Sequence, residues 1–238
     1  MDFIVDLPPA AGHTCILVVV DLLTKMAHFI PCKGLPSARE MADLYLRHVF
    51  RLHEAPENLI TDRGSQFTSH FWHAFHTLLG TQVHLSTAHH PQTDGQTERT
   101  NATLEQYLRC YVNHQQSDWL DLLPVAEFAY NNALHSSTQQ TPFMANYGFH
   151  PRFFPETTPV STVPAADDRI QELQALQQVL QMQLEQAKDS YKTAADRKRQ
   201  LHVGDWVWLS TRYLHSSRTS RKLDARYVGP FLITDQIN

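Results

Sequence analysis

The 238-residue sequence has few cysteines, no long apolar run and no excess of positive charge. Its three cysteines, Cys15, Cys32 and Cys110, are odd in number and widely spaced, which argues against a disulfide framework and against a four-ligand zinc site. We expect all three to be reduced thiols in the core. The longest uncharged apolar run, residues 15–20, is far too short to cross a bilayer, and no basic and then apolar leader opens the chain. We therefore expect neither export nor a membrane partner.

The charge of the chain is unevenly distributed. The formal net charge is −4, which is unusual for a protein that binds nucleic acid. Between Lys188 and Arg226, however, ten Lys or Arg residues face four Asp residues, and this stretch alone has a net charge of +6. It is the candidate for contact with phosphates. On charge alone, however, a solvated surface is the favoured interpretation of the stretch.

The order of hydrophobic patterns indicates an α/β domain over residues 1–148. The β-branched run at 14–21 is typical of a strand covered on both faces, and short strands at 2–7 and 28–31 flank it. Further strands are predicted at 58–61 and 82–85, and helices at 38–52, 70–79, 96–114, 119–130 and 142–147. We expect a mixed sheet flanked by helices. The residues expected to face inward are Met41, Leu44, Tyr45, His48 and Leu52 in the first helix and Phe71, Phe75, Leu78 and Leu79 in the second.

The remainder of the chain divides into three segments. Residues 149–166 are rich in proline and predict a linker, and residues 167–200 carry apolar residues at alternating steps of three and four, which predicts a long amphipathic helix. Residues 201–238 contain strand patterns at 206–209 and 227–234 and predict part of a small, SH3-like β-barrel. We expect Trp206 and Trp208 to lie in the core of that barrel.

Three carboxylates stand at the ends of predicted elements: Asp2, Asp62 and Glu98. Asp62 and Glu98 have 35 residues between them, and each lies in a polar turn with glycine, TDRGSQF at 61–67 and HHPQTDGQTE at 89–98. Glycine allows the backbone to approach a phosphate closely. Mg²⁺ prefers a few carboxylate oxygens and leaves positions open for water and phosphate, so such a trio suits a pair of these ions. On spacing alone, however, solvated surface carboxylates are the simpler interpretation.

The motifs around these carboxylates resemble the D,D-35-E signature of retroviral and retrotransposon integrases, and the Ty3/gypsy group most of all. Similar stretches run from MDFIVDLP at the start to NATLEQYLRCYVNHQQSDWLDLLPVAEFAYNNALHSST, and the Gly229-Pro230-Phe231 triplet resembles that group's GPY/F module. The resemblance covers nearly the whole chain, and its several motifs occur in the family's order.

The resemblance implies an RNase H-like fold and a polynucleotidyl transferase that trims DNA ends and joins them to target DNA. It assigns Asp2, Asp62 and Glu98 to catalysis and to binding of Mg²⁺ or Mn²⁺, as two ions. It also implies a homo-oligomer, and the DNA substrate implies a nuclear location. The residues that would contact DNA are Arg63, Ser65, His89, Gln92 and Arg99 beside the triad, and Arg218, Arg221 and Lys222 in the basic stretch.

Two other functions stay open. The N-terminal His/Cys zinc-binding domain of full-length integrases has no counterpart in this sequence, so a truncated or domesticated DNA-binding protein without turnover is the second hypothesis. A nuclease that cleaves RNA in a hybrid would share the fold and the metals and is the third.

Overall fold

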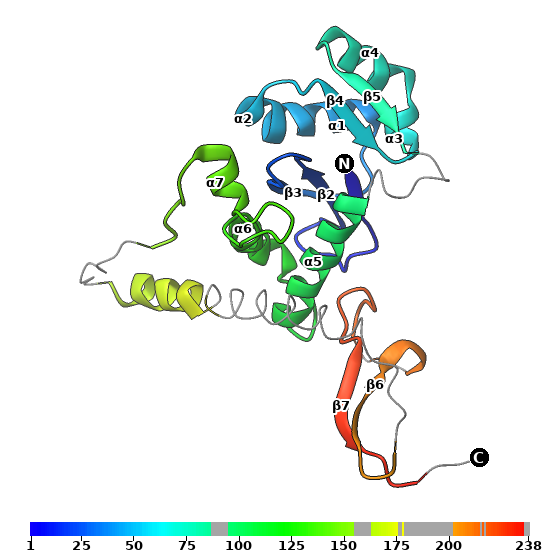
Figure 1. The fold of residues 1–238 in the computed structure, drawn as a ribbon, viewed down its shortest axis with the longest axis vertical. Helices are drawn as coiled ribbons and strands as arrows, with labels where there is room; N and C mark the ends of the chain where they lie inside the picture. The colour runs from blue at the N-terminus through cyan, green and yellow to red at the C-terminus, as the bar shows by residue number, and fades with distance from the viewer. Residues whose placement is uncertain are drawn as a thin grey trace.

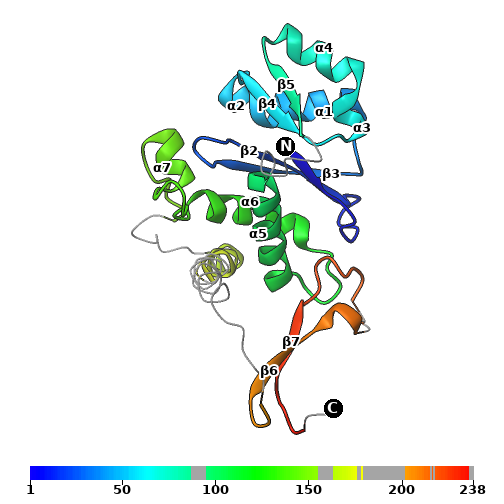
Figure 2. The same ribbon diagram turned by 45° about the vertical axis from the view of Figure 1, so that its right-hand side comes forward.

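The computed structural model describes residues 1–86, 95–154, 163–175, 178, 202–214, 216 and 218–235. Most of these form a layered body around two small sheets, from which a two-stranded ribbon projects (Figures 1 and 2). None of the helices within these ranges is long and apolar enough to cross a membrane.

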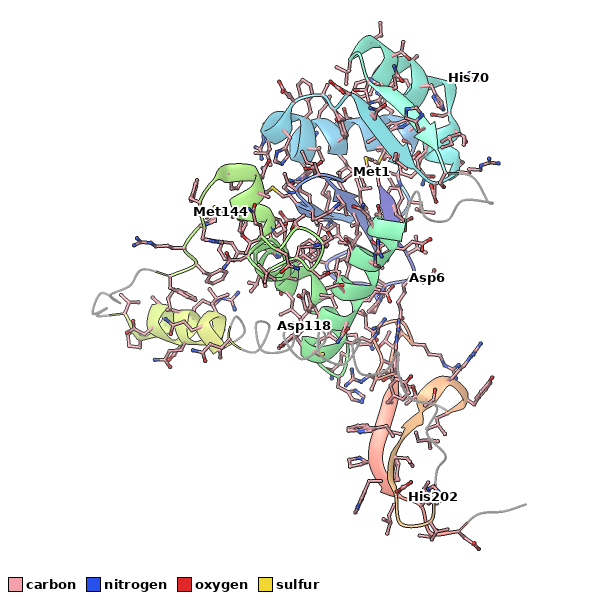
Figure 3. The ribbon with its side chains drawn as sticks, in the orientation of Figure 1. Met1, Asp6, His70, Asp118, Met144 and His202 are labelled. Carbon is pink, nitrogen blue, oxygen red and sulfur yellow. The ribbon has the colours of Figure 1, made fainter. Side chains whose placement is uncertain are left out.

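The sheets of the main body hold five strands. β1 (Asp2–Ile4), β2 (Cys15–Val20) and β3 (Ala27–Cys32) form an antiparallel sheet in that order, whereas β4 (Asn58–Thr61) and β5 (Gln82–Leu85) pair in parallel. The amine of Met1 donates a hydrogen bond of 2.7 Å to the carbonyl of Ile60, so the start of β1 meets the end of β4. Figure 3 shows Met1 between the two sheets. The predicted mixed strand arrangement is therefore present.

β1 is shorter than the predicted strand at 2–7. It ends at Ile4, and Asp6 has a φ of 61°, a value that takes the backbone out of the extended region. The amide of Leu7 then bonds to the carbonyl of Thr14, so the connection turns back onto β2.

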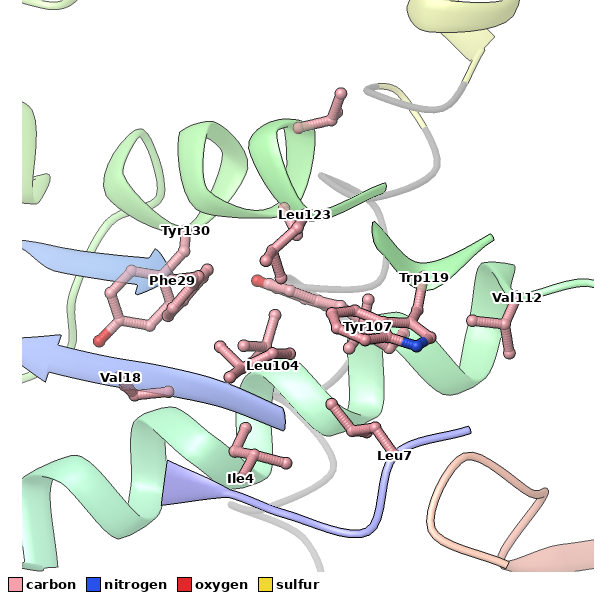
Figure 4. Close-up of a cluster of buried hydrophobic side chains, with 14 of the residues drawn as sticks. Ile4, Leu7, Val18, Phe29, Leu104, Tyr107, Val112, Trp119, Leu123 and Tyr130 are labelled. Carbon is pink, nitrogen blue, oxygen red and sulfur yellow. The ribbon is translucent and has the colours of Figure 1, made fainter. Parts of the chain in front are cut away.

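One face of the antiparallel sheet is covered by α5 (Gly95–Tyr111) and α6 (Trp119–Asn131). Because side chains alternate along a strand, Ile16 and Val18 of β2 point to this face. They pack against Leu104 and Tyr107 of α5 and against Trp119, as Figure 4 shows for the labelled members of the cluster. The Trp119 indole donates 2.7 Å to the carbonyl of Pro8, which ties α6 to the turn after β1.

The opposite face is covered by α1 (Ala38–Tyr45) and α4 (His70–Leu78), which meet the alternate residues Cys15, Leu17 and Val19. Three short elements complete this layer: η1 (Leu46–Phe50), α2 (Arg51–His53) and α3 (Ser65–Thr68). The interpretation of residues 14–21 as a strand covered on both faces is thus confirmed.

The predicted inward faces of the first two helices are partly wrong. The capping box of Ser37 and Glu40 is present, and Met41 and Tyr45 are buried, but η1 is a π-helix. Its wider turns rotate the later residues, so Val49 is buried and Leu52 is exposed.

In α4, Phe71 and Leu78 are exposed, and Trp72 and His76 occupy the inward face. Both faces of this helix carry large side chains, so periodicity did not separate them. The predicted end of the helix at Gly80, which has a φ of 76°, is confirmed.

After α7 (Pro142–Tyr147), a helix spans residues 164–175 and thus begins within the predicted linker. Its Leu173 packs against the cluster on the α5 and α6 face. The rest of the predicted long helix lies outside the described residues, apart from residue 178.

The C-terminal module consists of β6 (Trp206–Ser210) and β7 (Tyr227–Leu232), paired antiparallel, with the turn η3 (Thr211–Tyr213) after β6. Trp206 and Trp208 are 68% and 62% exposed, so the prediction that they form a barrel core is wrong within the described chain, where no second sheet covers them. Cys110 on α5 is exposed, so the prediction of three core thiols holds only for Cys15 and Cys32.

Candidate active site

Asp2 lies on β1 with its carboxylate against the first turns of α5. One oxygen accepts the amide of Phe3 at 2.7 Å, and the other accepts the side-chain amide of Asn101 at 2.6 Å. Asn101 follows Glu98 by three residues, which is one turn of the same helix. The first and third predicted carboxylates are therefore connected through α5.

Asp62 directly follows β4. Its Oδ1 accepts the amide of Gly64 at 2.9 Å, and a Cβ at position 64 would lie 3.0 Å from that oxygen and 2.6 Å from Nε2 of Gln66. A larger residue would thus force the side chain of Gln66 or of Asp62 to shift. Since the bond from Met1 to Ile60 joins β1 and β4, Asp2 and Asp62 belong to the ends of neighbouring strands.

Glu98 lies in the first turn of α5 and is exposed. Neighbouring residues fix this turn: Thr97 and Thr100 are buried, the Thr100 hydroxyl lies 3.0 Å from the hydroxyl of Tyr130, and Lys25 donates 2.9 Å to Gln96. Glu98 is therefore presented to solvent from an anchored helix end.

The three carboxylates are not gathered into a finished metal cluster. Within the part of the chain that the structure describes, no three His, Cys, Asp or Glu side chains form a group that could hold a metal ion. Their donor chemistry nevertheless fits Mg²⁺, because carboxylate oxygens are its preferred ligands. Oδ1 of Asn101, beside Asp2, is also buried and has no hydrogen-bond partner among the described residues. A buried oxygen without a partner is costly, and a cation nearby would compensate it.

The remaining predicted contacts lie around this edge and in the basic stretch. Arg63 is exposed and donates 3.1 Å to the carbonyl of Ser86, Ser65 begins α3, and Arg99 is exposed beside Glu98. His89 and Gln92 lie outside the described residues.

The predicted basic residues of the C-terminal segment are engaged within the protein. Arg218 lies 3.6 Å from Asp224, Arg221 donates 3.2 Å to the carbonyl of Leu214, and Lys222 lies 3.6 Å from Glu105 of α5. The structure thus places Lys222 beside α5, whereas the other two lie within their own segment.

A network of His28, His53 and Glu127 was missed from the sequence. One oxygen of Glu127 lies 2.9 Å from Nδ1 of His28 and the other accepts the amide of Phe29 at 2.7 Å, while Nε2 of His28 lies 2.8 Å from Nε2 of His53. Burial, followed by the charge of His28, lowers the pKa of His53. The three residues come from α6, β3 and α2, so no local pattern could have predicted their meeting. His28 and His53 border a groove of about 990 Å³ that also reaches Thr97, the neighbour of Glu98.

Comparison with known proteins shows what this arrangement is similar to. Residues 1–91 match the family model described as "Integrase core domain". This part of the chain is therefore similar to the integrase core domain. The chain is also 33% identical, over 98% of its length, to the Transposon Tf2-3 and Tf2-4 polyproteins of Schizosaccharomyces pombe. These alignments include the basic C-terminal stretch, and the resemblance to Ty3/gypsy-type integrases is confirmed. The chain spans only about 18% of the length of these polyproteins.

Solved structures agree on the fold of the integrase core. A chain of the simian T-cell lymphotropic virus intasome, solved in complex with the PP2A regulatory subunit B56 gamma, matches 68% of this chain and 59% of its own with a TM-score of 0.52 at 21% identity. The predicted RNase H-like α/β fold is confirmed. The HTLV-2 integrase catalytic core domain, solved in complex with magnesium, is a weaker match, with a TM-score of 0.45 at 22% identity over 55% of this chain and 83% of its own.

Proposed function

We propose that this integrase core catalyses DNA integration: it trims the ends of retroelement DNA and joins them to target DNA by phosphoryl transfer. The observation that supports the proposal is the hydrogen bond from Asn101 to Asp2, which connects Asp2 to the helix that carries Glu98. The bond from Met1 to Ile60 likewise connects the start of β1 to the strand that precedes Asp62. The reaction needs no covalent protein nucleophile, because water or a DNA 3′-hydroxyl attacks phosphorus.

In this proposal, Asp2, Asp62 and Glu98 hold two Mg²⁺ or Mn²⁺ ions. Such ions lower the pKa of an attacking hydroxyl and stabilise the charge on the leaving oxygen. The protein supplies orientation: the amide of Asn101 fixes one oxygen of Asp2, and the amide of Gly64 fixes Oδ1 of Asp62. The exposed guanidinium groups of Arg63 and Arg99 flank the carboxylates and would contact phosphate oxygens.

The working form would be a homo-oligomer, because joining the two ends of one element requires two active sites on one DNA assembly. Its DNA substrate would place it in the nucleus.

The test is strand joining with pre-trimmed DNA ends and Mg²⁺, comparing the chain with its Asp62→Asn and Glu98→Gln variants. Each variant should lose more than about 100-fold in joining rate, because the amide that replaces the carboxylate is a poor ligand for the ions. Asp43→Asn, which changes an exposed carboxylate on α1, is the matched control and should join DNA at the normal rate. Joining that survives Asp62→Asn would overturn the proposal.

A DNA-binding protein without turnover is the second candidate. It is favoured by one observation: among the described residues, the three carboxylates do not form a group able to hold a metal. This candidate predicts that the unaltered chain binds DNA and joins none in either Mg²⁺ or Mn²⁺.

A further inference from the structure

Residues 218–226 are docked onto the integrase core. The amide of Ser220 donates 2.7 Å to Oε1 of Gln116, Nε2 of Gln116 donates 3.0 Å to the carbonyl of Ser220, and the Ser220 hydroxyl donates 3.2 Å to the carbonyl of Asp6. Leu223 is fully buried in the cluster formed by α5 and α6. Figure 3 shows Asp6 at the side of the core where this segment arrives from the ribbon. The segment that leads into β7 is therefore part of the core's packing.

Docking gathers three cations around one carboxylate. Glu105 of α5 lies 2.5 Å from Arg109 on the next turn, 3.6 Å from Lys222 and 3.6 Å from Arg226. Glu105 and Arg109 are the least exposed members of the group, with side chains 15% and 10% exposed. With one carboxylate against three cations, the group has an excess positive charge of two.

The side chains of Lys222 and Arg226, the two more exposed cations, have N–H groups that are not used in hydrogen bonds within the described ranges. At 3.6 Å their contacts with Glu105 are ion pairs rather than hydrogen bonds, and neither side chain donates a hydrogen bond to another residue in the described ranges. The side chains of Lys222 and Arg226 are 28% and 64% exposed. Arg109, in contrast, donates to the carbonyl of Lys222 at 2.9 Å and to Glu105.

The group also lies in line with the proposed active site. Glu98 and Arg109 are eleven residues apart on α5, which is roughly 16 Å at the rise of an α-helix. That distance is about five base-pair steps of duplex DNA. A duplex that follows α5 from Glu98 would thus bring its backbone to Lys222 and Arg226.

We propose that Lys222 and Arg226, held in place by Glu105 and Arg109, form a phosphate-binding site for the DNA backbone at the C-terminal end of α5. The proposal rests on the proposed function, since DNA is the partner in both. It divides the basic stretch into two parts: Lys222 and Arg226 contact DNA, whereas Arg218 and Arg221 stabilise the segment through Asp224 and the carbonyl of Leu214.

The test measures binding of the full chain to a fluorescent DNA duplex, without divalent metal, at salt concentrations from about 50 to 200 mM. Each phosphate contact adds about 0.9 to the slope of log affinity against log salt. Lys222→Gln and Arg226→Gln should each lower this slope by about 0.9 for every duplex sequence.

Two matched controls each remove one positive charge elsewhere. Arg39→Gln removes an exposed charge from α1, and Arg47→Gln removes one from η1. Both should keep the slope of the unaltered chain. Thermal melting of every variant identifies any that fail to fold.

The outcomes separate the two proposals. If the unaltered chain binds duplex with no salt dependence, phosphate-dominated binding is absent and the proposed function itself fails. If it binds with a steep slope that Lys222→Gln and Arg226→Gln leave unchanged, or that Arg39→Gln lowers as much as Arg226→Gln does, the site proposed here is overturned while DNA binding stands.

Discussion

The two faces of the antiparallel sheet are both fully packed. Each holds a buried hydroxyl without a partner among the described residues, that of Tyr107 on one face and that of Tyr45 on the other, but their tryptophans differ. Trp119 on one face and Trp72 on the other are both completely buried. The indole of Trp119 donates to the carbonyl of Pro8, whereas that of Trp72 has no partner among the described residues. Near Trp72, the hydroxyl of Tyr45 and both ring nitrogens of His76 also lack partners within the described chain.

The difference shows that a side chain can be fully buried without a hydrogen-bond partner for its polar atoms. On the face of α5 and α6, Asn131 pairs with both backbone groups of Ala27, and a residue from the far end of the chain, Leu223, fills the cluster. On the face of α1 and α4, aromatic rings pack edge to face, with the ring centroids of Trp72 and His76 at 4.2 Å, and their polar atoms remain uncompensated. Shortening a buried side chain on the face of α5 and α6 should therefore destabilise the protein. Removing a buried polar atom without a partner on the face of α1 and α4 should stabilise it.

Leu223→Ala should have the largest effect. Removing a fully buried leucine side chain costs about 2–5 kcal/mol of unfolding free energy, because a cavity remains where the contacts were. Urea unfolding at neutral pH measures this loss. Trp208→Ala, which removes an exposed side chain of β6, should change the value by less than about 1 kcal/mol. A small effect of Leu223→Ala would mean that the C-terminal segment is not part of the core in solution.

His76→Phe should have a smaller effect that grows as the pH falls. Burial, followed by the charge of His73, lowers the pKa of His76 to about 4. As the pH falls, His76 therefore takes up a proton in the unfolded chain at a higher pH than in the folded chain. The protein loses stability between about pH 6.5 and pH 4, by about 3 kcal/mol in total. Phenylalanine has no proton to bind, so the variant should be the more stable protein at pH 5, and the difference should shrink towards neutral pH.

Denaturant unfolding of both proteins between pH 4 and 7 gives this difference directly. Other histidines with lowered pKa values, His48 and His53, contribute equally to both curves and cancel. A constant difference across the pH range would show that His76 has the same pKa in the folded and the unfolded chain, which would contradict this account.

The sequence predicted the features that rest on local patterns. The two-sided strand at 14–21, the capping box at Ser37 and the helix end at Gly80 each follow from a few adjacent residues. The motifs of the chain, taken together, likewise predicted the similarity to the integrase core domain and the fold.

Features that depend on distant partners could not be predicted. The inward face of α4 is set by packing against Tyr45, and the π-helix at 46–50 moves Leu52 outward. The burial of Leu223 depends on α5, more than a hundred residues earlier, and the exposure of Trp206 depends on what covers β6. The role of each predicted site residue stays a prediction, because only measurements of DNA joining or metal binding can test it.

The most direct test of the central claim, that Asp2, Asp62 and Glu98 together bind catalytic metal, is a titration of the full chain with Mn²⁺, followed by electron paramagnetic resonance of the free ion. The unaltered chain should take up Mn²⁺, Asp62→Asn should weaken that uptake strongly, and Asp43→Asn should leave it intact. Uptake that Asp62→Asn does not change would contradict the claim.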